Sequence, residues 1–337
     1  MAFVSSDLSD YLQFSMPIWQ APLPFEIISA EFSGQISDTG GVGIIRVGEA
    51  ETAANLEEKL QKYSKKHKNP AICFTHRLPH YSEFKKSNSQ HFEQLARQYS
   101  IESIANGDNF LDLLDTALGF SPRLVGFANG IPDRDVLSFI RNSGALTFAV
   151  CHSLMEALTA EEYGISCVVL QGTEAGGEQF HFANNLPVER QSGLILLQQL
   201  RQLSNMPIIL WSPIAHGADI VSAIILGAQA VMVDRILVRS ALSENARKYL
   251  DSKTEYDLRC DTQYTARKMR YIPAENATVL HLPDISSIER EIIASEYLRA
   301  NPEQIPYPVC VNNSNLPTKL SELFATLSQQ AGEILQR

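Results

Sequence analysis

Short apolar segments, many of them rich in β-branched residues, recur along the first two thirds of the chain. Each is bounded by glycine, proline or polar residues, which is typical of buried strands in a parallel sheet. Eight such segments occur, at 18–21, 42–47, 71–75, 124–127, 147–151, 167–170, 208–211 and 230–233. We therefore expect eight strands.

The sequence between these strands has apolar residues at three- and four-residue spacing, as amphipathic helices do. This pattern predicts helices at 50–66, 133–142, 154–163, 191–203 and 218–226. Gly144, Gly164 and Gly227 follow three of them, where a glycine commonly ends a helix. The alternation predicts an α/β fold, a TIM (β/α)8 barrel, with a doubly wound open sheet as the alternative.

Two regions depart from the repeat. The stretch 69–121 is longer than one strand and helix require, and 82–98 is polar with a helical pattern, so we predict an insertion around 76–121 within a barrel domain at 1–238. Beyond residue 239 the repeat stops, and 243–268, 288–298 and 316–335 have helical patterns. Residues 239–337 are therefore expected to form a mainly helical C-terminal extension packed on the barrel.

Composition narrows the classes of partner. With 28 Lys+Arg against 38 Asp+Glu, the formal net charge of −10 argues against nucleic acid or an anionic membrane. The five cysteines are widely spaced and contain no C-x-x-C pair, so the sequence indicates neither a disulfide framework nor a zinc site. Free cysteines of this kind fit a reducing cytoplasm best. No basic leader precedes an apolar core in 1–16, and no long apolar run follows, so we expect a cytoplasmic protein without a membrane span or a metal.

A polar, glycine-containing loop follows the strand predicted at 167–170. Residues 171–178 read Gln-Gly-Thr-Glu-Ala-Gly-Gly-Glu. Parallel α/β proteins bind ligands at the C-terminal ends of their strands, and glycines let the main chain approach a ligand closely. The alternative is that Gly176 and Gly177 only make a tight turn.

The loop resembles the flavin-binding loop of the nitronate monooxygenase family, strand-Gln-Gly-x-Glu-Ala-Gly-Gly-His. The chain is also similar to that family at 17–23 (Pro-Ile-Trp-Gln-Ala-Pro-Leu), at 39–43 (Thr-Gly-Gly-Val-Gly) and at 130–132 (Gly-Ile-Pro). The resemblance covers roughly 17–238 and implies an FMN-binding TIM barrel of the nitronate monooxygenase and enoyl reductase superfamily. It assigns FMN binding to Ala21, Pro22, Leu23, Gln171, Gly172, Glu174, Ala175, Gly176 and Gly177.

The loops after strands seven and eight differ from the family pattern. There the family has Ala-Gly-Gly-Ile and Gly-Thr-Arg-Phe, which hold the FMN phosphate, whereas this chain has Trp-Ser-Pro-Ile at 211–214 and Val-Asp-Arg-Ile at 233–236. Pro213 lacks an N–H donor, and Asp234 brings a negative charge toward a dianion. The Ser212 hydroxyl and the Arg235 guanidinium can compensate; otherwise Asp234 and Arg235 pair with each other or lie at the barrel wall. By resemblance, the phosphate side of the site is formed by Ser212, Ile214, Ala215, Asp234 and Arg235.

The catalytic position differs as well, because Glu178 stands where the family carries its catalytic His. Glu178 can act as a base only if desolvation raises its pKa. His152, after strand five, and His181, three residues beyond Glu178, are the candidate substitutes. His152 can equally cap the following helix, and His181 can equally be a surface residue of the loop.

The resemblance implies an FMN-dependent oxidoreductase with an atypical site. Its substrate would be a nitronate or nitroalkane oxidised with O₂, or an acyl-thioester (an enoyl thioester) reduced with NAD(P)H. The alternative is a catalytically silent or non-redox barrel that acts as a binding or partner subunit, with a protein partner or a second copy of the chain.

Overall fold

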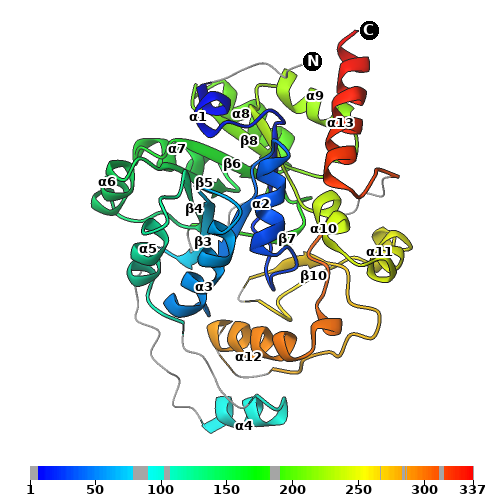
Figure 1. Cartoon of the computed structure of the whole chain (residues 1–337). Helices are drawn as coiled ribbons and strands as arrows, with labels where there is room; N and C mark the ends of the chain where they lie inside the picture. The colour runs from blue at the N-terminus through cyan, green and yellow to red at the C-terminus, as the bar shows by residue number, and fades with distance from the viewer. Residues whose placement is uncertain are drawn as a thin grey trace.

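Eight parallel strands form the centre of the molecule (Figure 1). The computed structural model describes residues 7–78, 90–101, 107–182, 190–265, 267–282, 285, 287–310 and 315–336. The hydrogen-bonded order is β1-β9-β8-β6-β5-β4-β3-β2, and a parallel bridge between Trp19 and Val42 joins the two ends. The strands are β1 (Ile18–Gln20), β2 (Ile44–Val47), β3 (Ala71–Arg77), β4 (Leu124–Asn129), β5 (Leu146–Cys151), β6 (Cys167–Gln171), β8 (Ile208–Trp211) and β9 (Ala230–Val233). The sheet therefore closes into the predicted TIM barrel, and all eight strand positions are confirmed.

Large side chains fill the barrel interior. The rings of Trp19 and Phe148 meet edge to face at 5.7 Å, and both are fully buried. A β-carbon on Gly126 would lie 2.0 Å from the Phe148 ring, so glycine is required there. The barrel is thus a packed core, as in other folds of this class, and chemistry is confined to its rim.

Helices surround the barrel, and each predicted helix between strands is present. Serine, threonine or asparagine side chains cap several of them, such as Ser153 at the start of α7 and Ser192 at the start of α8. Gly144, Gly164 and Gly227 have φ of 88°, 79° and 104°, the left-handed conformation that ends a helix. These helices are α2 (Ala30–Asp38), α3 (Ala53–Ser64), α5 (Phe110–Leu118), α6 (Arg134–Asn142), α7 (Leu154–Glu162), α8 (Gly193–Arg201), α9 (Gly217–Ile225) and α10 (Arg235–Ala241).

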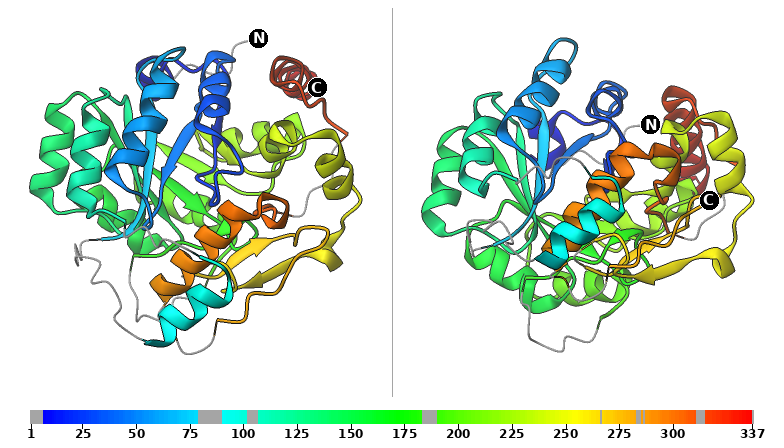
Figure 2. Two further views of the ribbon diagram at one scale, coloured as in Figure 1. Left: turned by 60° about the horizontal axis from the view of Figure 1, so that its bottom comes forward. Right: turned by 90° about the horizontal axis from the view of Figure 1, so that it is seen from below.

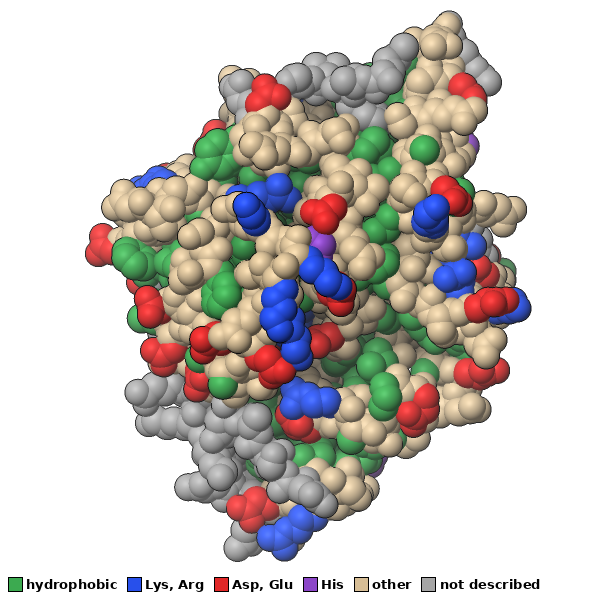
Figure 3. All heavy atoms as spheres, in the orientation of Figure 1, with side chains coloured by type: hydrophobic (Ala, Val, Ile, Leu, Met, Phe, Trp, Pro, Cys, Tyr) green, Lys and Arg blue, Asp and Glu red, His purple; other side chains and the backbone are tan. Residues whose placement is uncertain are grey.

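The outer surface of α2 and α3 carries both signs of charge, with basic and acidic side chains interleaved (Figure 3). Lys62 pairs with Glu58, and Lys66 pairs with Glu31. These exposed ion pairs make the outer surface of α2 and α3 a solvated, charged face. Among the residues that the structure describes, no helix has the length and apolar character needed to cross a bilayer.

A second layer covers the C-terminal ends of the strands (Figure 2). Helix α4 (Gln90–Gln98), in the stretch predicted to be an insertion, lies beside α12 (Ser287–Ala300). A small sheet of β7 (Gly177–Glu178), β10 (Arg259–Asp261) and β11 (Met269–Tyr271) adjoins them. Phe92, Leu95, Met269, Ile292 and Ile293 share a separate apolar core in this layer. Residues 79–89 and 102–106 of the predicted insertion lie outside the described residues.

The region after 239 contains helices and one strand pair. The prediction of a helix over 243–268 is correct only for α11 (Glu244–Asp251) and is wrong for the second half, where β10 lies. The physical reason is tertiary: β10 pairs with β11, which in turn pairs with β7 of the glycine loop. The predicted helices at 288–298 and 316–335 are confirmed as α12 and α13 (Leu320–Leu335). The other short elements are α1 (Asp7–Leu12), η1 (Glu255–Asp257) and η2 (Pro302–Gln304).

Candidate functional site

The loop after β6 is held in place by its own amide side chain. Gln171 Nε2 donates to the Glu178 carbonyl at 2.7 Å, and the Phe180 N–H donates to Gln171 Oε1 at 2.9 Å. Gln171 is 1% exposed, so the nitrogen and the oxygen of its side-chain amide both find hydrogen-bond partners away from solvent. In this structure Gln171 fixes the path of the loop.

The glycines of this loop approach protein. A β-carbon on Gly176 would lie 2.4 Å from Cys310 N and 2.4 Å from the carbonyl carbon of Val309. Gly177 has φ 78°, and a β-carbon there would lie 2.8 Å from the Leu23 side chain. Gly172 is buried, and the Glu174 carboxylate lies against it. The segment at 308–310 and the loop after β1 therefore pack closely against Gly176 and Gly177.

Glu174 ties two strand-end loops together. Its Oε1 accepts hydrogen bonds from Ser212 Oγ at 2.9 Å and from the Gly193 N–H at 2.9 Å. The Ser212 hydroxyl, which the sequence offered as a phosphate donor, is used in this contact. Ala175 between these loops is fully buried.

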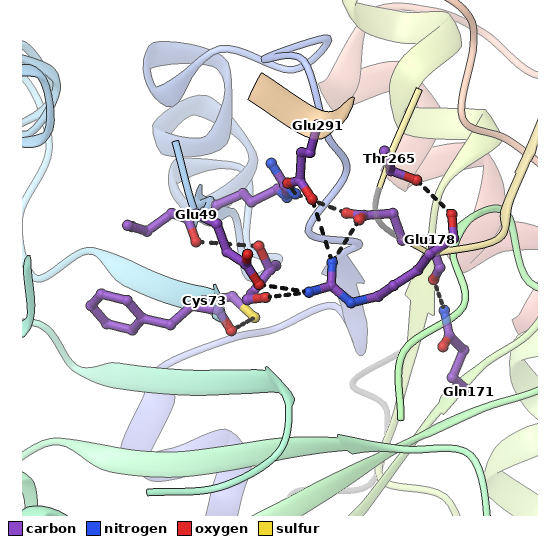
Figure 4. A network of polar contacts seen from close by, with 11 residues as sticks. Glu49, Cys73, Gln171, Glu178, Thr265 and Glu291 are labelled. Atoms are coloured by element: carbon purple, nitrogen blue, oxygen red, sulfur yellow. Dashed lines mark hydrogen bonds and ion pairs between the residues drawn. The ribbon is translucent and has the colours of Figure 1, made fainter. Parts of the chain in front are cut away.

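Glu178 lies in a buried ion cluster (Figure 4). Its Oε2 is 2.8 Å from an Arg46 nitrogen, and its Oε1 is 3.0 Å from an Arg267 nitrogen. The Glu178 side chain has no exposed surface. Because each carboxylate oxygen accepts a charge-assisted hydrogen bond, Glu178 is placed as an ion-pair partner of the two arginines.

Arg267 closes the mouth of the barrel. It comes from the segment before β11 and also contacts Glu49 Oε1 at 3.0 Å and the Thr75 carbonyl at the end of β3 at 3.1 Å. Its guanidinium lies 5.7 Å from the centre of the Phe180 ring. Burial by itself would lower the pKa of Arg267, but the nearby carboxylates, Glu178 first, raise it. Arg267 therefore stays charged inside the protein.

The cluster is close to electrical neutrality. Glu291 of α12 lies 3.4 Å from Arg46 and 3.9 Å from Arg267. Burial, followed by the charges of Glu178 and Glu49, raises the pKa of Glu291 to about 7. With Glu291 protonated, two arginines balance the two remaining glutamates.

The two candidate histidines lie together but belong to a separate contact set. Their ring centres are 5.9 Å apart, and His152 Nδ1 is 2.8 Å from Glu156 Oε2. The other Glu156 oxygen accepts from the Phe182 N–H at 2.8 Å. Burial, together with the neighbouring charges, lowers the pKa of His181. Glu156 thus links the start of α7 to the loop that carries His181.

The strand-end loops after β8 and β9 are also internally satisfied. Both oxygens of Asp234 accept hydrogen bonds, among them the Trp211 indole N–H at 3.2 Å and the Cys310 N–H at 2.9 Å. Arg235 donates to the carbonyls of Leu250 at 2.8 Å and Cys310 at 3.3 Å, and so points into the C-terminal extension. Ile214 is buried, and the Ala215 N–H donates to Asp219 at 2.9 Å.

The loop after β1 is buried beneath the same layer. Ala21 is fully buried, Leu23 is 5% exposed, and Pro22 between them is buried as well. By resemblance this turn faces the flavin ring. Here Leu23 packs against Gly177.

The comparisons with known proteins identify the family. The nitronate monooxygenase family model matches residues 5–297. The chain belongs to the nitronate monooxygenase family. It is 26% identical over 252 residues to a nitronate monooxygenase of Paraburkholderia phytofirmans, covering 71% of this chain and 68% of that protein. It is 24% identical over 270 residues to a probable nitronate monooxygenase of Bacillus subtilis, covering 76% of each.

Solved structures show the same fold. A nitroalkane oxidase from Streptomyces ansochromogenes aligns with a TM-score of 0.76 and 19% identity over 98% of this chain and 99% of that chain. FabK from Thermotoga maritima aligns with a TM-score of 0.69 and 16% identity over 99% and 98%. These neighbours share the fold, and family membership supports an oxidoreductase in general.

The residues present do not fit FMN in this conformation. The family positions on the loops after β1, β6, β8 and β9 include Ala21, Gln171, Gly176 and Asp234, and all four are buried by the chain's own atoms. The side chain of Trp211 is fully buried among these loops and packs against Phe180 at 6.3 Å between ring centres. A flavin needs an open cleft over the strand ends. Here Arg267 lies against β3 near its end, and Trp211 and Asp234 are buried at the ends of β8 and β9.

Reasoning from sequence missed the arginines and two of the acids in the cluster, namely Arg46, Arg267, Glu49 and Glu291. One signal was available: Arg46 interrupts the apolar run of β2, and a charge inside a buried strand needs a partner. Arg267 and Glu291 gave no comparable signal, because they lie in the C-terminal region and reach the barrel only through tertiary packing. Among the described residues, no group of three or more His, Cys, Asp or Glu side chains is arranged to hold a metal.

Proposed function

We propose that this chain is a flavin-free member of the nitronate monooxygenase family that acts as a binding or partner subunit and does not oxidise nitronates. The observation that carries the proposal is the closure of the barrel mouth by Arg267, whose guanidinium contacts Glu178 and the end of β3. A ligand over the strand ends would have to displace a buried charge from its partners, which costs several kcal/mol.

The catalytic position agrees with this proposal. Removal of a proton from a nitroalkane needs a base with a free lone pair directed at the substrate. Both Glu178 oxygens are engaged by arginines. His152 Nδ1 lies 2.8 Å from Glu156 Oε2, and this contact supports a structural role for that nitrogen.

A second candidate is an FMN-dependent oxidoreductase acting on a nitronate or an enoyl thioester. It is favoured by the family match over 5–297 and by the retained Gln-Gly-x-Glu-Ala-Gly-Gly loop. This function requires Arg267 and Asp234 to leave their present partners before FMN can enter. The two candidates therefore differ in whether the purified protein holds flavin.

The test is flavin content followed by titration. We expect the purified protein to lack flavin absorption, to release none on denaturation, and to leave the fluorescence of added FMN unquenched. Stoichiometric flavin, or saturable quenching at micromolar FMN, would refute the flavin-free proposal. In that case oxygen consumption with propyl nitronate, and enoyl thioester reduction, would decide between the two flavin reactions.

A further inference from the structure

Four N–H donors from separate parts of the chain converge on the Asp234 carboxylate. Asp234 Oδ2 accepts from the Gly176 N–H at 3.0 Å and from the Trp211 indole N–H at 3.2 Å. Asp234 Oδ1 accepts from the Cys310 N–H at 2.9 Å and from the Arg235 N–H at 2.6 Å. Asp234 is 2% exposed, so these donors take the place of water.

The donors form a cradle for an anion. Gly176 comes from the loop after β6, Trp211 is the last residue of β8, Arg235 follows Asp234 at the start of α10, and Cys310 belongs to the segment at 308–310 that lies over Gly176. The Arg235 guanidinium points away, toward the carbonyls of Leu250 and Cys310. The carboxylate of Asp234 is therefore hydrogen-bonded by neutral N–H groups, as bound oxyanions often are.

We propose that the Asp234 carboxylate is an internal replacement for the phosphate of a ligand, and that the cradle itself remains competent to bind a small oxyanion. The carboxylate supplies the charge that the donors require, and through Cys310 it also holds the covering segment over Gly176. The cradle is closed to ligands because the chain provides its own anion. This proposal rests on the proposed flavin-free function and explains how the phosphate end of the site is satisfied.

The test uses Asp234→Gly, which removes the carboxymethyl group and leaves room for a small oxyanion. Asp219→Ala is the matched control, because Asp219 accepts from the Ala215 and His216 N–H groups, both at 2.9 Å, in a neighbouring loop but has no convergent cradle. Melting temperatures of wild type and both variants are measured in inorganic phosphate, in acetate and in chloride at equal ionic strength. The control corrects for the general stabilising effect of phosphate.

We expect Asp234→Gly to melt below wild type and to recover part of the loss in phosphate, saturably, beyond the change seen in Asp219→Ala. At ten times the dissociation constant, binding multiplies the folding equilibrium constant by about elevenfold. Phosphorus NMR of inorganic phosphate should show line broadening with Asp234→Gly and none with wild type. If Asp234→Gly does not fold, Asp234→Thr, the family residue, is titrated in the same way.

Three outcomes would overturn the proposal. One is a phosphate response in Asp234→Gly no larger than in the control. Another is recovery with acetate alone, which would mean that the cradle fits only a carboxylate. The third is that both Asp234→Gly and Asp234→Thr fail to fold and that refolding them in phosphate does not restore the folded protein. Each can occur while the wild-type protein is flavin-free, whereas flavin in the wild type would refute the proposed function itself.

Discussion

Replacing Arg267 by alanine should destabilise the protein more than any single change at its surface. The guanidinium contacts Glu178 and Glu49, each at 3.0 Å, and the Thr75 carbonyl at 3.1 Å. Its side chain is 4% exposed, so water does not replace these contacts when the arginine is removed. The variant would leave the buried glutamates Glu178 and Glu291 with Arg46 alone, and would remove the ion-pair partner of the half-buried Glu49.

The size of the effect follows from the burial of the partners. Removing one member of a buried ion pair typically costs about 3–5 kcal/mol, because the remaining charge is left unpaired. For large domains a loss of 1 kcal/mol lowers the melting temperature by about 2 °C, so we expect a decrease of about 6–10 °C. The loss should be smaller at pH 5 than at pH 8, because burial and the neighbouring glutamates raise the pKa of Glu291 to about 7, and its protonation at pH 5 removes one of the negative charges.

Urea unfolding at the two pH values measures this loss directly. Arg134→Ala is the control, since Arg134 is 57% exposed and pairs with Glu162 at 3.2 Å, and an exposed pair is worth about 1 kcal/mol or less. A double-mutant cycle with Glu178→Ala isolates the pair, and we expect a coupling free energy of at least about 2 kcal/mol. If Arg267→Ala costs no more than Arg134→Ala, the buried cluster does not close the barrel mouth.

Two further predictions concern the same layer. Burial, followed by the charges of Glu178 and Glu49, raises the pKa of Glu291 to about 7. The stability that protonated Glu291 confers is therefore fully present below its unfolded pKa of about 4.3, and it is lost as the pH rises through 7. Urea unfolding should therefore show Glu291→Gln more stable than wild type at pH 8, and exposed Glu303→Gln unchanged. Gly176→Ala should lower the free energy of unfolding by about 1–3 kcal/mol, because the new β-carbon clashes with Val309 and Cys310. The control Gly332→Ala lies in α13 with open space around it and should raise the free energy of unfolding. Equal melting temperatures of the two variants would contradict this prediction.

The barrel could be predicted from the sequence because the apolar runs that favour strands locally are the same residues that the fold buries in the sheet. Each strand from β1 to β9 in the barrel is a short apolar run, and its neighbours in space are mostly its neighbours in sequence. The hairpin of β10 and β11 lacked such a pattern. Arg259, Cys260 and Asp261 are polar or reactive residues on a partly exposed strand, and only pairing with β11 makes them extended.

The sequence predicted where the candidate site lies, but it did not predict which side chains occupy it. The loop at 171–178 does lie at the C-terminal ends of the strands, as its glycines and its place after β6 indicated. What fills the space above it comes from 267, 291 and 308–310, which are distant in sequence. No spacing rule connects Arg267 to Glu178, so their pairing could be seen only in the structure.

The glycines of this loop show why a motif alone does not establish a ligand. A glycine allows close approach of the main chain to any group, and here that group is the backbone of Val309 and Cys310. The residues that discriminate between ligand and protein lie on the neighbouring strand ends, where a ligand would need small side chains. Trp211 and Asp234 stand there instead, and each is joined to the other by a hydrogen bond of 3.2 Å. The glycines of this loop therefore contact the backbone of the chain itself, and the proposed flavin-free function follows from that contact together with Trp211 and Asp234 at the neighbouring strand ends.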